Sequence, residues 1–188
     1  MAISLALTAA KEGATLINYA EVKSFIKKGE LINGLSISDN ISNKSFKIRA
    51  KVVVNATGVF SDELIRLDQP NAKPMIRPSQ GVHLVLEKKF LNGPHAIMVP
   101  QTSDGRVLFA VPWNNYVVVG TTDTPIVSAT HEPIALKKEI NFILENAGNY
   151  MTKKPKISDV KSVFAGLRPL AASKNNNEPI KEVSRHHK

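Results

Sequence analysis

Three separate segments of this chain hold side chains that could bind an anion and move a proton. Arg168 follows an apolar run and precedes a proline, and its guanidinium can form two parallel hydrogen bonds to a phosphate or a carboxylate. His83 lies just after Gly81 on the way into another apolar run, where an imidazole can hold a hydroxyl or transfer a proton. Residues 120–125 add threonine hydroxyls and the carboxylate of Asp123. These residue types predict a polar pocket at the ends of β-strands.

Each of these segments also has a purely structural interpretation. His83 could be a hydrogen-bonded histidine that serves stability alone, and Arg168 could belong to a surface ion pair. Residues 120–125 could form an Asx-turn that closes a hairpin. The residue types by themselves leave both interpretations open.

A fourth segment, residues 51–58, runs from a series of valines into Ala56, Thr57 and Gly58. A continuous β-branched run is typical of a strand buried on both faces of a parallel or mixed sheet. The glycine that follows lets backbone N–H groups approach a phosphate or a flavin edge, because no Cβ is in the way. The alternative is a buried strand that needs a glycine only in order to turn.

The elements that would position these residues follow from the hydrophobic pattern. Apolar residues at helical spacing predict a helix over residues 2–12 and another over 134–146, and Ser61 resembles the start of a third. Alternating segments between residues 15 and 49 predict a small β-meander. Beyond a proline-rich join at 69–78, apolar segments predict mainly antiparallel strands at 81–86, 96–99, 106–111, 116–120 and 160–165. The expected fold class is α+β: a mostly antiparallel sheet flanked by helices.

Composition excludes several classes of function. The 188 residues include no cysteine, so there is no disulfide framework, thiolate metal site or cysteine nucleophile, and no metal is expected. No secretory signal and no apolar run of about 20 residues is present, which predicts a cytoplasmic protein. The net charge is +9, and residues 151–188 hold nine basic residues against three acidic ones. Because no aromatic residues interleave the Lys/Asn stretch at 173–179, we expect no nucleic-acid partner.

The motifs resemble those of FAD-dependent glycerol-3-phosphate dehydrogenases. Residues 79–83, Ser-Gln-Gly-Val-His, are similar to the Ser-Lys-Gly-x-His of that family, with Gln80 in place of the lysine. Residues 120–124, Gly-Thr-Thr-Asp-Thr, and 166–169, Gly-Leu-Arg-Pro, match two further family motifs. Ala56, Thr57 and Gly58 resemble the segment that packs near FAD, and Val22 matches a position that contacts the adenine through its main chain.

The resemblance implies an oxidoreductase that converts sn-glycerol 3-phosphate to dihydroxyacetone phosphate by hydride transfer to FAD, with quinone or oxygen as the electron acceptor. It implies catalytic roles for His83 and Arg168, and substrate-binding roles for these two residues together with Thr121 and Thr122. It implies FAD contacts at Val22, Ala56, Thr57 and Gly58. It also allows peripheral association with the inner face of the cytoplasmic membrane.

The resemblance further implies a domain order. Residues 1–68 would form part of an FAD-binding α/β domain, residues 69–175 the substrate-binding domain, and residues 176–188 a basic tail. The chain has no Gly-x-Gly-x-x-Gly after a strand, so it reads as an internal fragment that neither retains FAD nor turns over alone. Two alternatives remain: a related FAD-dependent amine or 2-hydroxy-acid oxidase, and a non-enzymatic basic binding module.

Overall fold

The computed structural model describes residues 1–171 and contains two compact units. The first unit comprises residues 1–56 and 63–72; the second comprises residues 57–62 and continues from residue 73. Each unit has a sheet of its own. No helix within residues 1–171 is long and apolar enough to cross a membrane. The basic tail expected at residues 176–188 lies outside the described residues.

The first unit is built around a three-stranded antiparallel sheet, as the β-meander pattern predicts. Gly34 lets two of the strands approach closely, because a Cβ at this position would lie 2.3 Å from the carbonyl oxygen of Ile48. An ion pair of 2.6 Å between Lys27 and Asp68 ties the sheet to a helix. The elements are α1 (Ala2–Lys11), β1 (Ala20–Lys28), β2 (Leu31–Asp39), β3 (Ser45–Arg49) and α2 (Ser61–Asp68), whose first two residues belong to the second unit.

The prediction of a buried strand at residues 51–56 is wrong for this structure. These residues belong to no strand, and the side chains of Val52 and Val54 are 75% and 81% exposed. A strand exists only where a neighbour pairs with its backbone, and none of the strands within residues 1–171 pairs with this segment. The β-branched composition of this segment favours a strand, but the described residues provide no partner strand for it.

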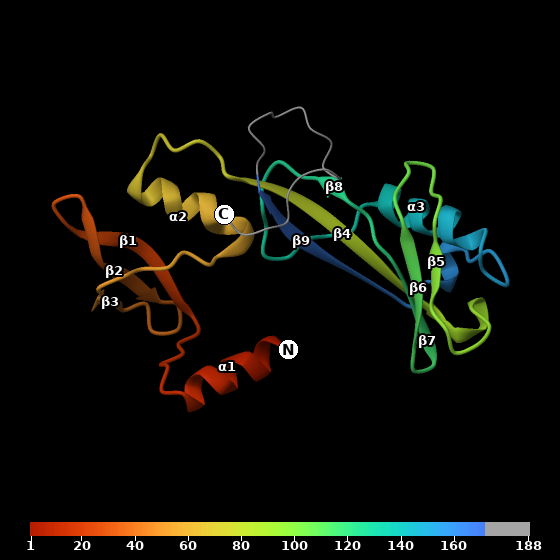
Figure 1. Cartoon of the computed structure of the whole chain (residues 1–188), viewed down its shortest axis with the longest axis horizontal. Coiled ribbons are helices and arrows are strands. Elements are labelled where there is room, and N and C mark those ends of the chain that lie inside the picture. Colours follow the sequence, from red (N-terminus) through yellow and green to blue (C-terminus); the bar gives the residue numbers. More distant parts are fainter. Residues whose placement is uncertain (172–188) are drawn as a thin grey trace. The chain divides into compact units, whose positions relative to one another are not determined.

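The second unit is dominated by an antiparallel sheet whose longest strand, β4 (Ile76–Glu87), is paired along both of its sides. Along one side β4 pairs with β9 (Ser162–Ala171), and Figure 1 shows these two strands running side by side. Along the other side it pairs with β7 (Tyr116–Gly120) and with the short β8 (Thr124–Pro125). The sheet continues through β6 (Leu108–Trp113) to β5 (Ile97–Val99). The predicted antiparallel sheet is confirmed.

Several strand boundaries of this sheet differ from the prediction, and two of them involve prolines. The proline-rich join was expected to extend to residue 78, but β4 already begins at Ile76. The last strand was expected to end at residue 165, but β9 continues through Arg168 to Ala171. Both strands therefore pass through a proline, and Pro78 lies directly opposite Pro169.

The core of the second unit lies between this sheet and α3 (Lys137–Gly148). Val82, Leu84 and Leu86 alternate along β4 and are fully or almost fully buried, so this face of the strand is turned toward α3. The residues between them therefore point to the opposite face, which carries the candidate site. Three short 3₁₀ helices complete the described elements: η1 (Gly58–Phe60), η2 (Lys88–Phe90) and η3 (Ile157–Asp159).

Candidate active site

Strand pairing gathers the residues of three distant sequence segments on one face of the sheet. Residues directly opposite each other in an antiparallel pair share a face. Such pairs join β4 to its neighbours β9 and β7 on the face opposite α3. The pairs are Ser79 with Arg168, Gly81 with Gly166, and His83 with both Phe164 and Gly120.

The loop that follows β7 holds the guanidinium of Arg168 in place. Its Nη2 donates to Thr121 Oγ1 at 2.8 Å, and its Nη1 donates to the carbonyl oxygen of Thr122 at 3.0 Å. The Asp123 carboxylate lies 3.5 Å from Nη1, so it partly compensates the charge. The Arg168 side chain is still 26% exposed. The guanidinium is thus oriented by the protein and remains accessible to an anion.

Asp123 is itself anchored to β4. The Ser79 hydroxyl donates a short hydrogen bond to Asp123 Oδ1 and also lies 3.4 Å from the carbonyl oxygen of Thr124. Ser79 is fully buried, which fixes the position of its hydroxyl. Strand β4 and the loop therefore hold Arg168 from two sides. The peptide bond between Gly120 and Thr121, at the start of this loop, is cis.

Two glycines make room for the functional side chains. A Cβ at Gly81 would lie 2.3–2.6 Å from three atoms of the Arg168 guanidinium. A Cβ at Gly120 would lie 2.4 Å from Cδ2 of His83. Real Cβ atoms do not approach other heavy atoms this closely, so both side chains lie in space that only glycine leaves open.

His83 is held between two neighbouring strands. Its ring stacks on that of Phe164, with centroids 5.1 Å apart and planes inclined by 9°. Burial lowers the pKa of His83 below its usual 6.5, and the nearby positive charge of Arg168 lowers it further. The imidazole is therefore neutral at neutral pH, the form that can accept a proton.

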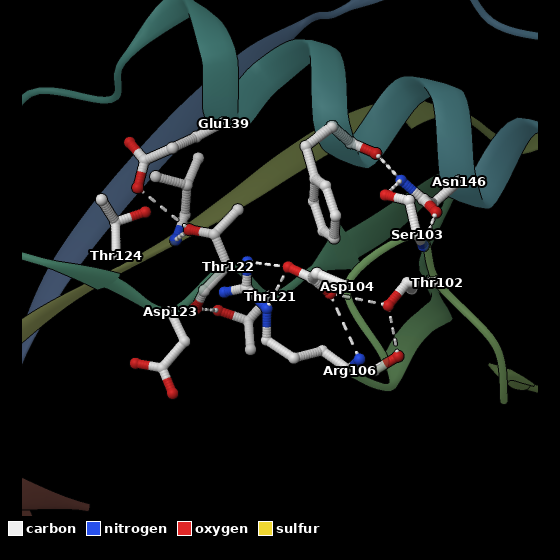
Figure 2. Close-up of polar contacts among 12 residues, drawn as sticks. Thr102, Ser103, Asp104, Arg106, Thr121, Thr122, Asp123, Thr124, Glu139 and Asn146 are labelled. Carbon is white, nitrogen blue, oxygen red and sulfur yellow. Dashed lines mark hydrogen bonds and ion pairs between the residues drawn. The ribbon is translucent and has the colours of Figure 1, made fainter. Parts of the chain in front are cut away.

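The two threonines predicted to bind substrate point in different directions. Thr121 turns its hydroxyl toward the Arg168 guanidinium. The side chain of Thr122 is 1% exposed; its Oγ1 accepts from the backbone N–H of Val82 at 3.0 Å and donates to Glu139 Oε1 at 3.2 Å. Figure 2 shows Glu139 above Thr122, with a dashed line between them. Thr122 contacts Arg168 through its carbonyl oxygen.

A second arginine lies near this loop but is a weaker anion ligand. Arg106 lines a cavity of about 280 Å³ together with Asp123, Lys138 and Phe142. Its Nε donates to Asp104 Oδ2 at 2.6 Å, and its Cζ lies 5.0 Å from the centre of the Phe142 ring. The Asp104 carboxylate contacts Arg106 directly and compensates its charge, whereas the Asp123 carboxylate lies 3.5 Å from Arg168 Nη1. Arg168 is therefore the stronger candidate.

The predicted FAD-contacting residues are divided between the two units. Val22 is half-buried in β1, while Ala56 and Thr57 are exposed. Val22 and Ala56 belong to the first unit, and Thr57 and Gly58 belong to the second. Gly58 has a φ of +59° and open space where its Cβ would be. This turn fits the close approach of a cofactor to the backbone.

No role was predicted from the sequence for three residues that build the site. Ser79 and Gln80 lay inside a recognised motif, but their partners could not be predicted from it. Glu139 lies at the third position of α3, and its Oε2 accepts from the backbone N–H of Leu136 at 2.8 Å. A glutamate at this position is a known helix-start signal. Its burial against β4 becomes visible only in the fold.

Comparison with known proteins places the chain in a family. A family model described as "FAD dependent oxidoreductase" matches residues 1–187. The mitochondrial glycerol-3-phosphate dehydrogenase of Mus musculus is 37% identical over 195 residues, covering all of this chain and 26% of the relative. A probable mitochondrial glycerol-3-phosphate dehydrogenase of Dictyostelium discoideum is 38% identical, again over the whole chain and over 32% of the relative. The chain thus spans about a quarter to a third of these curated relatives.

Solved structures agree with this placement. The glycerol-3-phosphate dehydrogenase of Bacillus halodurans, complexed with FAD, matches with a TM-score of 0.79 and 34% identity over 90% of this chain and 34% of that one. The L-α-glycerophosphate oxidase of Mycoplasma pneumoniae has the same fold, with a TM-score of 0.66 and 22% identity over 90% of this chain and 44% of that one. The family model and the fold together show that this chain belongs to the FAD-dependent oxidoreductases.

Proposed function

We propose that this chain forms the substrate-binding part of an FAD-dependent glycerol-3-phosphate dehydrogenase. The observation that carries the proposal is the Arg168 cluster: a partly exposed guanidinium, oriented by Thr121 and Thr122, beside a neutral His83. The names of the relatives support glycerol 3-phosphate as the substrate. The whole holoenzyme would oxidise sn-glycerol 3-phosphate to dihydroxyacetone phosphate.

In this proposal Arg168 anchors the phosphate. A guanidinium and a phosphate form paired, charge-assisted hydrogen bonds, which are stronger than neutral ones. Asp123 keeps the guanidinium compensated while no substrate is bound. Because Thr121, Thr122 and Asp123 hold the side chain beforehand, little conformational entropy is lost when the phosphate binds.

His83 would take up the proton of the C2 hydroxyl. Its neutral imidazole can accept that proton as the alcohol becomes a ketone. When bound, FAD would supply the redox chemistry, as the acceptor of the C2 hydrogen and its two electrons. Thr57 and Gly58, together with Val22 and Ala56, would contact the cofactor through their backbones.

We also propose an electron acceptor and a location for the holoenzyme. The electrons would pass from the reduced cofactor to quinone or to oxygen. We place the holoenzyme in the cytoplasm, peripherally on the inner face of the membrane, where a chain of net charge +9 is attracted to anionic lipids.

The experiment that tests this function compares wild-type holoenzyme with an Arg168→Ala variant. Loss of a charge-assisted contact of about 1.5–3 kcal/mol should raise the KM for glycerol 3-phosphate by roughly 10- to 100-fold. Glycerol, which lacks the phosphate, is the matched control substrate, and its oxidation should respond far less. An unchanged KM for glycerol 3-phosphate would show that Arg168 does not anchor the phosphate.

A further inference from the structure

Glu139 is a carboxylate buried in the interior of the second unit. It is 3% exposed and lies in the first turn of α3. Three donors surround it: Gln80 Nε2 at 2.8 Å, the Leu136 backbone N–H at 2.8 Å and the Thr122 hydroxyl at 3.2 Å. A buried carboxylate is costly unless its oxygens are hydrogen-bonded, so these three donors are what makes the position tolerable.

Gln80 connects this carboxylate to β4. Its side chain is 5% exposed, and its Nε2 donates both to Glu139 and to the carbonyl oxygen of Ile134 at 3.1 Å. One amide therefore ties the strand to α3 and to the segment before it. This is the position at which the family resemblance leads us to expect a lysine. In this chain the neutral amide of Gln80 donates to the Glu139 carboxylate instead.

Thr122 links Glu139 to the candidate active site. Its hydroxyl accepts from the Val82 N–H, and its single hydrogen is directed to Glu139. The side chain is thereby fixed on the α3 side of the sheet, and the carbonyl oxygen of the same residue accepts from Arg168 Nη1 at 3.0 Å. A rotation or shift of Thr122 would move both contacts together. Figure 2 shows Thr122 with its neighbours Thr121 and Asp123 below Glu139.

We propose that Glu139 is a positioning residue for Arg168 and acts through Thr122, with Gln80 holding Glu139 in place. Glu139 touches neither substrate nor cofactor in this proposal. Its effect on catalysis rests on the proposed function, in which Arg168 grips the phosphate. A purely structural Glu139 would stabilise the start of α3 without affecting the position of Arg168.

The test uses the FAD-loaded holoenzyme with two variants that break the link at different points. Glu139→Leu removes the acceptor, and Thr122→Val removes only the hydroxyl from a buried side chain of nearly the same shape. Thr122→Val also keeps the test possible if Glu139→Leu does not fold. The matched control is Glu145→Leu, which makes the same substitution at an exposed position of the same helix.

The first readout is the crystal structure of each variant. We expect the 3.0 Å contact between Arg168 Nη1 and the Thr122 carbonyl to be lost in Glu139→Leu and Thr122→Val and to remain in Glu145→Leu. If Arg168 keeps its position in both link variants, the positioning role is wrong, whatever the kinetics show.

The second readout is the KM for glycerol 3-phosphate. We expect both link variants to raise KM by about 10-fold with a smaller change in kcat, as the loss of one charge-assisted contact would do. Combined with Arg168→Ala, Thr122→Val should have no further effect on KM; additive effects would overturn the proposal. If Arg168→Ala alone leaves KM unchanged while Arg168 still moves in the variant structures, the proposed function fails and the positioning role stands.

Discussion

Gly81 and Gly166 lie directly opposite each other in β4 and β9, but only Gly81 is covered by a side chain. The Arg168 guanidinium occupies the space where a Cβ of Gly81 would be, with its nearest atom 2.3 Å from that position. No described atom lies within 4 Å of the corresponding position at Gly166. The two glycines are therefore paired, but a methyl group added at Gly81 would displace Arg168, whereas one added at Gly166 would displace no described side chain.

This difference predicts the effect of Gly81→Ala in the holoenzyme. The added methyl group would displace the flexible end of Arg168 from its position beside Thr121 and Thr122. We expect folded protein with normal FAD content and a KM for glycerol 3-phosphate raised by about 10-fold or more. Gly166→Ala serves as the control, with KM and FAD content measured for both variants. Equal effects on KM would contradict a displacement specific to Arg168.

The role of His83 is tested by His83→Gln. General base catalysis contributes roughly 10²- to 10⁴-fold to a rate, so kcat should fall within that range while KM for glycerol 3-phosphate changes little. Steady-state kinetics of the holoenzyme measures both constants. A loss confined to KM would instead make His83 a binding residue, and an unchanged kcat would remove it from the mechanism.

The lowered pKa of His83 predicts a specific pH dependence. Burial is the larger cause and the charge of Arg168 the smaller, so the neutral imidazole should persist below pH 6.5. The unfolded chain takes up the proton more readily, so stability should fall as the pH drops from 6.5 through the lower folded pKa. Histidine ¹³C NMR of the labelled holoenzyme measures the midpoint, which should rise in Arg168→Ala. A wild-type midpoint at or above 6.5 would contradict this prediction.

Glu87 predicts an acid-sensitive contribution to stability. Hydrogen bonds from Lys161 and Lys89 lower the pKa of Glu87 from 4.5 to about 2. The ionised carboxylate should therefore stabilise the fold above pH 4.5, and this stabilisation should disappear as the pH falls toward 2. Glu87→Gln should flatten the pH dependence of the melting temperature in that window. Because these side chains are partly exposed, the difference should shrink at high salt; an unchanged profile at low salt would contradict the assignment.

The strands of the second unit could be predicted because their apolar residues alternate. Val82, Leu84 and Leu86 show the period of two that a half-buried strand requires. The strand ends were harder to predict, because Pro78 and Pro169 resemble loop signals. In the structure these two prolines lie directly opposite each other. Neither has an N–H group to donate, so they suit a position where the paired residues form no hydrogen bond with each other. That pairing is what brings Arg168 opposite Ser79.

The candidate site was only partly visible in the sequence. The residue types of Arg168 and His83 indicated anion binding and proton transfer, and the fold brings both to one face of the sheet. The contact between Gln80 and Glu139 joins residues 59 positions apart, and no local pattern specifies it. The prediction for residues 51–56 was wrong for a related reason. Their composition favours a strand, but a strand also needs a partner from another part of the chain.

The central claim is most directly tested by the visible spectrum of the holoenzyme before and after anaerobic addition of sn-glycerol 3-phosphate. The account predicts oxidised flavin bands that bleach on addition, because the bound cofactor accepts the hydride. Arg168→Ala should require a much higher substrate concentration for the same bleaching. Flavin that bleaches with an amine or a 2-hydroxy acid but not with glycerol 3-phosphate would contradict the proposed substrate, and the absence of flavin would contradict the proposed chemistry.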